Sequence, residues 1–165
     1  MEEIAAKTYY DSPIGTIEIT ASEFGIRSLR FIDYPTYEID PTQEHLLQCI
    51  GQLDEYFAGK RTHFTVPLDL QGTPFQRRVW QELVTIPVGG TVSYLDVAKA
   101  IESPDAVRAV GSACGSNQHW LLVPCHRVIG SDGKLTGYAA GLQRKRWLLE
   151  HEWAMLYGKQ TSLFD

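Results

Sequence analysis

Cysteine is scarce and scattered in this sequence. The 165 residues include only Cys49, Cys114 and Cys125, and no CxxC pair occurs. An odd number of widely spaced cysteines argues against a disulfide framework. Structural zinc sites usually draw on closely spaced cysteines and histidines, and the five histidines are also scattered, so we expect no metal site.

Long hydrophobic runs are also missing. No stretch approaches the roughly 18 consecutive apolar residues of a membrane-spanning helix. The opening MEEIAAK contains neither the basic nor the apolar segment of a secretory signal. The composition is otherwise that of a globular protein, with 44% hydrophobic and 21% charged residues. We therefore expect a folded, cytoplasmic protein that has no membrane partner.

Charge is distributed unevenly along the chain. Residues 1–71 carry five Lys/Arg and twelve Asp/Glu, a net charge of −7, whereas residues 72–151 carry nine and six, a net charge of +3. A basic segment inside an acidic chain is compatible with a nucleic-acid partner, because the local charge matters more than the total. We predict two domains, residues 1–71 and residues 72–165.

The first domain has the pattern of a small antiparallel sheet followed by a helix. Alternating apolar residues around turn residues predict two or three antiparallel strands within residues 7–33. Asp40 and Gln43, with a proline between them, have the order of an N-cap and a capping-box residue. We predict that a helix starts there and runs to about Phe57, and that one further strand lies around residues 64–68.

The second domain has the pattern of several short helices. Residues 73–76, Thr-Pro-Phe-Gln, predict a capped helix that runs to about Leu83. Ser93 predicts the N-cap of a second helix, and Ser103, followed by a proline, that of a third, which ends near Gly115. Two short helices joined by a tight turn have the spacing of a helix-turn-helix, but an ordinary helical hairpin has the same spacing.

The most informative segment surrounds the last cysteine. The apolar residues 120–123 predict a buried strand, which the following proline ends. Cys125 would then lie at the end of that strand, next to His126 and Arg127, whose charges can favour a thiolate. This pattern predicts a cysteine nucleophile, although a cysteine taken alone is more often a buried apolar residue. A final helix is predicted over about residues 142–152.

The segment PCHRV at residues 124–128 resembles the active-site signature of the O6-alkylguanine-DNA alkyltransferases. Further motifs of this family occur in the same order and spacing: GTVSY at 90–94, RAVG at 108–111, Asn117, GY at 137–138, WLL at 147–149 and HE at 151–152. The resemblance covers about residues 72–155. DSPIG at residues 11–15 looks, less specifically, like the family's smaller ribonuclease-H-like domain.

The resemblance implies both a fold and a reaction. The fold is α/β (α+β), with a small ribonuclease-H-like domain of sheet and helix before a mainly helical, winged-helix-like helix-turn-helix domain. The reaction is the irreversible repair of double-stranded DNA containing O6-alkylguanine. The damaged guanine is flipped into a pocket, and Cys125 keeps the alkyl group as a thioether, so each molecule acts once. No cofactor or metal is required, and we expect a monomer.

The resemblance also assigns catalytic roles. His126 accepts the thiol proton through a bridging water, and Glu152 orients the imidazole as the third member of a triad would. Glu150 is a competing candidate for that position. Tyr94 donates a hydrogen bond to the guanine as it leaves. The other two cysteines are expected to be structural.

Further residues are assigned to DNA and base binding. Arg108 fills the space of the flipped base, and Asn117 braces the turn before the active-site strand. Ala140 stands where glycine is more usual, so its methyl group is expected to narrow the pocket for bulky adducts. The expected pocket residues are Val128, Ser131, Tyr138 and Ala139. Arg127 is expected to be structural or to contact phosphate. The other expected phosphate contacts, or merely exposed cations, are Lys134, Arg144, Lys145 and Arg146.

Two other functions are compatible with parts of the pattern. Alkyltransferase-like proteins sense alkylated DNA without repairing it, but they carry tryptophan where Cys125 stands. A cysteine–histidine hydrolase would form an acyl-enzyme and turn over. The helix-turn-helix pattern and the single adjacent cysteine–histidine pair do not suggest a hydrolase.

Overall fold

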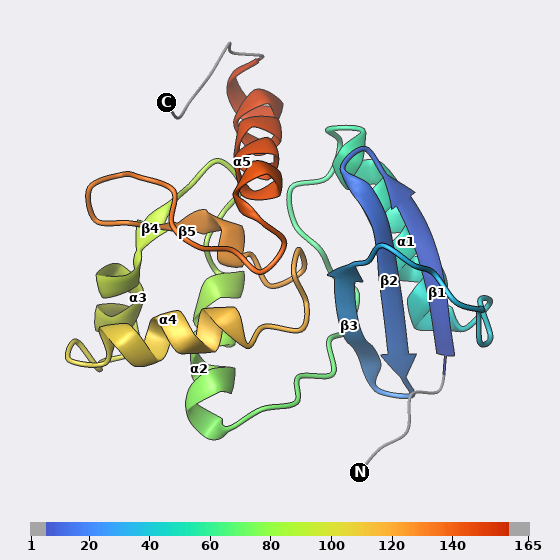
Figure 1. The fold of residues 1–165 in the computed structure, drawn as a ribbon, viewed down its shortest axis with the longest axis horizontal. Helices are drawn as coiled ribbons and strands as arrows, with labels where there is room; N and C mark the ends of the chain where they lie inside the picture. The colour runs from blue at the N-terminus through green and yellow to red at the C-terminus, as the bar shows by residue number, and fades with distance from the viewer. Residues whose placement is uncertain (1–5, 159–165) are drawn as a thin grey trace. The chain divides into compact units, whose positions relative to one another are not determined.

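The computed structural model describes residues 6–158, and the chain divides into two compact units (Figure 1). Unit 1 spans Met1–Gln71 and unit 2 spans Gly72–Asp165. Each unit buries its own set of apolar side chains. Within the described residues, no helix is long and apolar enough to cross a membrane.

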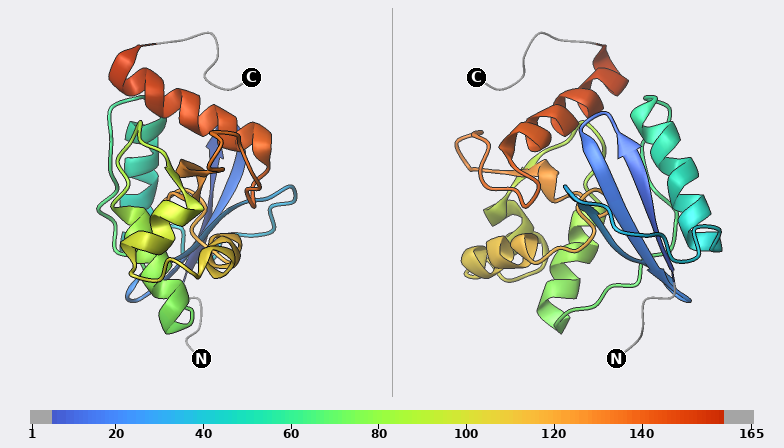
Figure 2. Two further views of the ribbon diagram at one scale, coloured as in Figure 1. Left: turned by 90° about the vertical axis from the view of Figure 1, so that its left-hand side faces the viewer. Right: turned by 45° about the vertical axis from the view of Figure 1, so that its right-hand side comes forward.

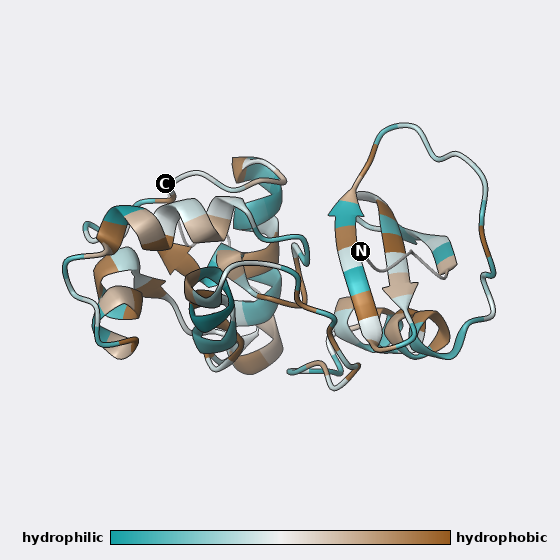
Figure 3. Ribbon diagram, turned by 90° about the horizontal axis from the view of Figure 1, so that it is seen from below, coloured by the Kyte–Doolittle hydropathy of each residue, from teal (hydrophilic) through white to brown (hydrophobic). Residues whose placement is uncertain are grey.

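Unit 1 is a three-stranded antiparallel sheet with one helix along one face (Figure 2). Hydropathy alternates along the strands, as Figure 3 shows, and Ile17 and Ile19 of the middle strand are fully buried. Leu46 and Leu53 of the helix are also fully buried. The prediction of antiparallel strands within residues 7–33 is confirmed. The elements are β1 (Ala6–Ser12), β2 (Gly15–Ser22), β3 (Gly25–Phe31) and α1 (Glu44–Phe57).

The predicted start of α1 was wrong. Asp40 has a left-handed backbone, with φ of 51°, and not the extended backbone of an N-cap. Just before it, Ile39 pairs with Lys7 of β1, which keeps the chain out of a helix. Gln43 is the N-cap, because its side chain accepts hydrogen bonds from two backbone N–H groups of the first turn, at 2.9 and 3.1 Å.

Residues 64–68 form one bridge and not the predicted strand. Leu68 pairs in parallel with Ile26 of β3, through the Ile26 N–H to the Pro67 carbonyl and the Asp69 N–H to the Ile26 carbonyl, both at 2.8 Å. Pro67 has no N–H to donate, so the parallel ladder cannot extend toward the N-terminus of this segment.

Unit 2 packs three short helices together and adds a longer one. Val79, Val97 and Val110, one from each short helix, are buried. Thr73 and Ser93 are the N-caps that the sequence predicted, each with a complete capping box. The two short strands pair in parallel. The elements are α2 (Pro74–Val84), β4 (Val92–Ser93), α3 (Tyr94–Ala100), α4 (Val107–Gly115), η1 (Cys125–Arg127), β5 (Val128–Ile129) and α5 (Leu142–Tyr157).

The turn between α3 and α4 differs from the predicted one. Ser103 does not cap α4, because its carbonyl accepts the N–H of Ala106 at 2.9 Å and closes a turn of its own. Glu102, with a left-handed φ of 59°, lies at the end of α3 just before this turn. α4 therefore begins only at Val107, with Ala106 as an N-cap that makes no side-chain hydrogen bond. The two helices still pack against each other as a helical pair.

Candidate active site

The segment before Cys125 is a buried turn, so the prediction of a strand over residues 120–123 was wrong. An apolar run specifies burial, but periodicity cannot tell a buried strand from another buried conformation. The Val123 N–H donates to the His119 carbonyl at 3.0 Å, which closes the turn without a partner strand. Cys125 consequently begins the short helix η1 and does not end a strand.

Asn117 holds this turn and also reaches the thiol. Its Oδ1 accepts the backbone N–H of His119 at 2.8 Å, and its Nδ2 donates to the Val123 carbonyl at 2.9 Å. The same Nδ2 lies 3.0 Å from Cys125 Sγ. Asn117 is almost fully buried. The side chain therefore fixes the position of the sulfur directly, in addition to bracing the backbone as the sequence predicted.

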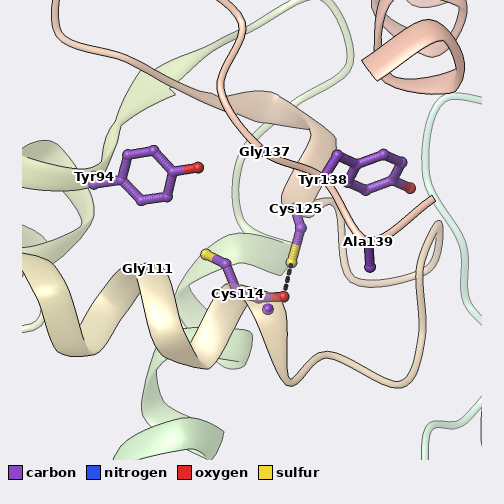
Figure 4. Close-up of a pocket in the computed structure, with 8 residues that line it drawn as sticks. Tyr94, Gly111, Cys114, Cys125, Gly137, Tyr138 and Ala139 are labelled. Atoms are coloured by element: carbon purple, nitrogen blue, oxygen red, sulfur yellow. Dashed lines mark hydrogen bonds between the residues drawn. The ribbon is translucent and has the colours of Figure 1, made fainter. Parts of the chain in front are cut away.

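The sulfur of Cys125 faces a cavity of about 330 Å³ (Figure 4). The S–H donates to the Cys114 carbonyl at the C-terminal end of α4, at 3.5 Å. The predicted site residues Tyr94, Tyr138 and Ala139 line the cavity together with the thiol. Three lining residues were not predicted for the pocket, namely Gly111, Cys114 and Gly115.

The thiol is not predisposed to ionise. The neighbouring Cys114 thiol raises the pKa of Cys125 well above its usual range, and burial acts in the same direction. Hydrogen bonding from Asn117 and the charge of Lys145 oppose this shift only in part. The expectation that His126 and Arg127 favour a thiolate is therefore not met. A base must remove the proton when the cysteine reacts.

His126, the next residue, is a neutral imidazole paired with a carboxylate. Its Nε2 lies 2.7 Å from Glu152 Oε2, and both side chains are buried. Burial lowers the pKa of His126, although the Glu152 charge acts in the opposite direction. A carboxylate partner holds the hydrogen on Nε2, which leaves Nδ1 as an acceptor. Nδ1 is buried and has no hydrogen-bond partner among residues 6–158.

Arg127 anchors Glu152 and does not reach outward to phosphate. Its Nε and Nη2 donate to the two carboxylate oxygens at 2.8 and 2.9 Å, and Nη1 donates to the Ile86 carbonyl at 2.6 Å. Burial alone would raise the pKa of Glu152, but His126 and Arg127 together lower it below its usual range. The carboxylate is therefore charged at neutral pH. Glu152, and not Glu150, is the partner of the imidazole.

Lys145 was expected at the surface, but it is fully buried. Its Nζ donates to the carbonyls of Val128, at 2.6 Å, and Thr136, at 3.3 Å. Burial lowers the pKa of Lys145 to about 8, while the two nearby thiols act in the opposite direction. Lys145 shares the buried face of α5 with Leu148, Leu149 and Glu152, so its helical position indicates burial although its charge favours the surface.

Three residues that the sequence assigned to the pocket lie elsewhere. Ser131 is exposed in a turn that the Gly133 N–H to Gly130 carbonyl bond closes, so its side chain does not line the cavity. Val128 is fully buried in β5, paired with β4. Ala140 is buried outside the cavity lining, so its methyl group does not narrow the pocket.

The remaining assignments concern DNA binding, the cysteine of α1 and metal binding. Arg108 is exposed on α4, as expected for a side chain that lies off the apolar face. Cys49 is buried in α1, and burial raises its pKa to about 12. In the described part of the chain, no group of three or more His, Cys, Asp or Glu side chains could hold a metal ion.

These features define a two-unit protein. Its second unit contains a helical pair and a buried cysteine that lines a pocket, and the next residue is a histidine paired with a buried carboxylate. The chain belongs to the 6-O-methylguanine DNA methyltransferase family. Residues 74–154 match the DNA binding domain of this family, and residues 6–70 match its ribonuclease-like domain. The resemblance and the mixed α/β fold inferred from the sequence are thereby confirmed.

Relatives from distant organisms match over most of the chain. The methylated-DNA–protein-cysteine methyltransferase of Mycobacterium tuberculosis (strain H37Rv) is 48% identical over 149 residues, covering 86% of this chain and 88% of the relative. The protein of the same name from Methanosarcina barkeri is 44% identical over 153 residues, covering 87% and 96%. The crystal structure of Mycobacterium tuberculosis OGT in complex with DNA superposes with a TM-score of 0.81, at 46% identity, covering 90% and 93%.

Proposed function

We propose that this protein repairs alkylated DNA by moving the alkyl group from the O6 oxygen of guanine to its own Cys125. One observation carries the proposal: the sulfur faces a cavity and is held by Asn117, beside a neutral histidine that is paired with a carboxylate. The relatives are named for methyl transfer from DNA to a protein cysteine. The structure of one of them contains DNA, which supports DNA as the partner here.

The chemistry begins with removal of the thiol proton. His126 Nδ1 accepts that proton, through a bridging water as the family resemblance implies, and Glu152 stabilises the resulting imidazolium. The sulfur then attacks the alkyl carbon, so that an S–C bond forms while the bond from that carbon to guanine O6 breaks. A soft sulfur nucleophile suits displacement at carbon. The thioether is stable, so the protein reacts once.

The leaving guanine must also be accommodated. It would depart as an anion unless a proton or a hydrogen bond reaches it. Tyr94 lies on the cavity wall opposite Tyr138 and Ala139, and its hydroxyl is a candidate donor that α3 contributes to the cavity (Figure 4). Over the whole reaction the thiol loses one proton and the guanine gains one, so no cofactor is needed to balance it.

DNA would be bound by the α3–α4 pair of unit 2. The basic charge of residues 72–151 favours contact with phosphates. A guanine inside a duplex cannot reach Cys125 unless it is flipped out, which costs a few kcal/mol. Arg108, exposed on α4, is assigned to fill the space that the base leaves. Its guanidinium can stack on the neighbouring bases and offset part of that cost.

Mass spectrometry of the intact protein tests the proposal. The protein is incubated with a duplex that contains one O6-methylguanine, and tryptic peptides are then mapped. We expect a single gain of about 14 Da, one methylene equivalent, on Cys125, at one methyl per molecule and without turnover. Cys125→Ala should gain nothing but still bind the lesion, whereas Cys49→Ala should react as the wild type does.

Other outcomes would identify the alternatives. Tight binding of the lesion with no gain in mass would indicate a non-catalytic sensor. Continued turnover of a substrate with an acyl-enzyme intermediate would indicate a hydrolase. Methyl transfer to Cys114 or Cys49 in the Cys125→Ala variant would show that the acceptor has been assigned wrongly.

A further inference from the structure

The hydroxyl of Tyr94 already has a partner within the protein. Thr136, in the loop between β5 and α5, places its Oγ1 2.9 Å from the Tyr94 hydroxyl, and either atom could be the donor. The Tyr94 hydroxyl points toward the side of the pocket where Cys125 lies (Figure 4). The protein partner of the proposed donor is therefore a side chain for which the family resemblance implied no role.

Thr136 is fixed by contacts at three points. Its carbonyl accepts a hydrogen bond from the buried Lys145 at 3.3 Å, and its hydroxyl meets Tyr94. Its methyl group lies against Gly130, because a Cβ placed on that glycine would come within 3.3 Å of Thr136 Cγ2. A β-branched side chain has few rotamers, and these contacts favour the one that directs the hydroxyl to Tyr94.

We propose that Thr136 is a positioning residue that holds the Tyr94 hydroxyl toward the departing guanine and strengthens it as a hydrogen-bond donor. The inference rests on the proposed function, because it concerns the leaving group of that reaction. Thr136 itself touches neither the guanine nor the sulfur in this account, and it acts only through Tyr94.

The direction of the hydrogen bond follows from the number of protons. Tyr94 has one hydroxyl proton, and if that proton points to the guanine, the Tyr94 oxygen must accept from Thr136. A donor to the Tyr94 oxygen stabilises the negative charge that grows there as the proton is shared with the guanine. The Thr136 proton stays on its own oxygen, so the proton balance of the reaction is unchanged.

The surroundings of Tyr94 make such help necessary. Burial raises the pKa of Tyr94, and the thiols of Cys114 and Cys125 raise it further, so the hydroxyl alone is a weak acid. The hydrogen bond from Thr136 is the interaction that lowers this pKa. Removing it would leave a donor that is less acidic and no longer held by a hydrogen bond within the protein.

A double-mutant cycle of single-turnover methyl transfer tests the inference, with duplex at saturating concentration. Thr136→Val keeps the shape but removes the hydroxyl, and we expect it to slow transfer about fivefold, the effect of one hydrogen bond. Thr136→Ser keeps the hydroxyl and should stay within about twofold of the wild type. In a Tyr94→Phe background, Thr136→Val should have no further effect, because the group through which it acts is gone.

Controls separate this role from a structural one. Thr85→Val, which removes an exposed hydroxyl at the end of α2, should leave transfer unchanged. Alkylation of Cys125 by iodoacetamide, which has no guanine leaving group, should be equally fast in Thr136→Val and the wild type. Thr136→Ala removes the same hydroxyl in a smaller side chain and replaces Thr136→Val if that variant does not fold.

The outcomes distinguish the inference from the function on which it rests. Wild-type transfer with an unimpaired Thr136→Val would overturn the inference alone. An equal slowing by Thr136→Val in both backgrounds would also overturn it, because it would reveal a structural effect of the loop. If the wild-type protein accepts no methyl group, the proposed function itself fails.

Discussion

At the scale of single residues, the protonation state of His126 sets the pH range of the reaction. Burial lowers the pKa of His126 below its ordinary value of 6.5, so the imidazole stays neutral where a free histidine is half protonated. We expect the transfer rate to be constant from about pH 8 down to 6.5 and to fall only at lower pH. Single-turnover rates measured across this range check the prediction.

The same shift links folding to pH in the same direction. Below pH 6.5 the unfolded chain binds a proton at this position more readily than the folded chain does. The folded state therefore loses more stability the further the pH falls toward the lowered pKa.

His63→Gln, at an exposed position in unit 1, is the matched control for the transfer rate, and its rate should depend on pH as the wild-type rate does. A rate already halved at pH 7 would contradict a neutral His126.

At the scale of elements, Glu152 ties α5 to η1 and to the end of α2. It pairs with His126 and Arg127, and Arg127 continues to the Ile86 carbonyl. Glu152→Gln would leave a buried guanidinium without a counter-charge, which typically costs about 3 kcal/mol of unfolding free energy. Urea denaturation of the full chain measures this loss.

Glu150 provides a matched control on the same helix. Glu150→Gln should change the free energy of unfolding by less than about 0.5 kcal/mol, as surface substitutions usually do. Equal stability losses in the two variants would mean that the contacts of Glu152 with His126 and Arg127 do not hold α5 in place. Neighbouring glutamates in one helix thus differ in role only because of what lies opposite each of them.

At the scale of the whole molecule, the reaction depends on a duplex giving up one base. Arg108→Ala should slow repair in duplex DNA about tenfold, because the stacked guanidinium that offsets base extrusion is lost. Transfer from free O6-benzylguanine needs no extrusion and should change less than about twofold. The two rates are compared by following the formation of alkylated protein.

Arg77→Ala, at an exposed position on α2, is the control for loss of one positive charge. It should leave the ratio of the two rates unchanged. If Arg108→Ala slowed both substrates equally, the arginine would act on the site itself and not on base extrusion.

Much of this protein was determined by its sequence alone. Local signals, namely alternation in the strands and the side-chain caps at Thr73 and Ser93, correctly placed the sheet and two of the helices. The motif around Cys125, together with the further motifs in the family's order and spacing over residues 72–155, correctly identified the family, because most of these motifs are short contiguous runs. Such features depend on neighbours in the chain, which a sequence displays directly.

Only the tertiary structure decided what surrounds the thiol. Lys145 looks like a surface cation in the sequence, and for Arg127 the sequence leaves a structural role and a phosphate contact open. Both are buried because backbone carbonyls and a carboxylate from distant segments receive them. The turn before Cys125 replaces a strand because the side chain of Asn117 satisfies its backbone. The contact of Thr136 with Tyr94 joins residues 42 positions apart. Contacts of this range depend on how the chain packs, and no local pattern encodes them.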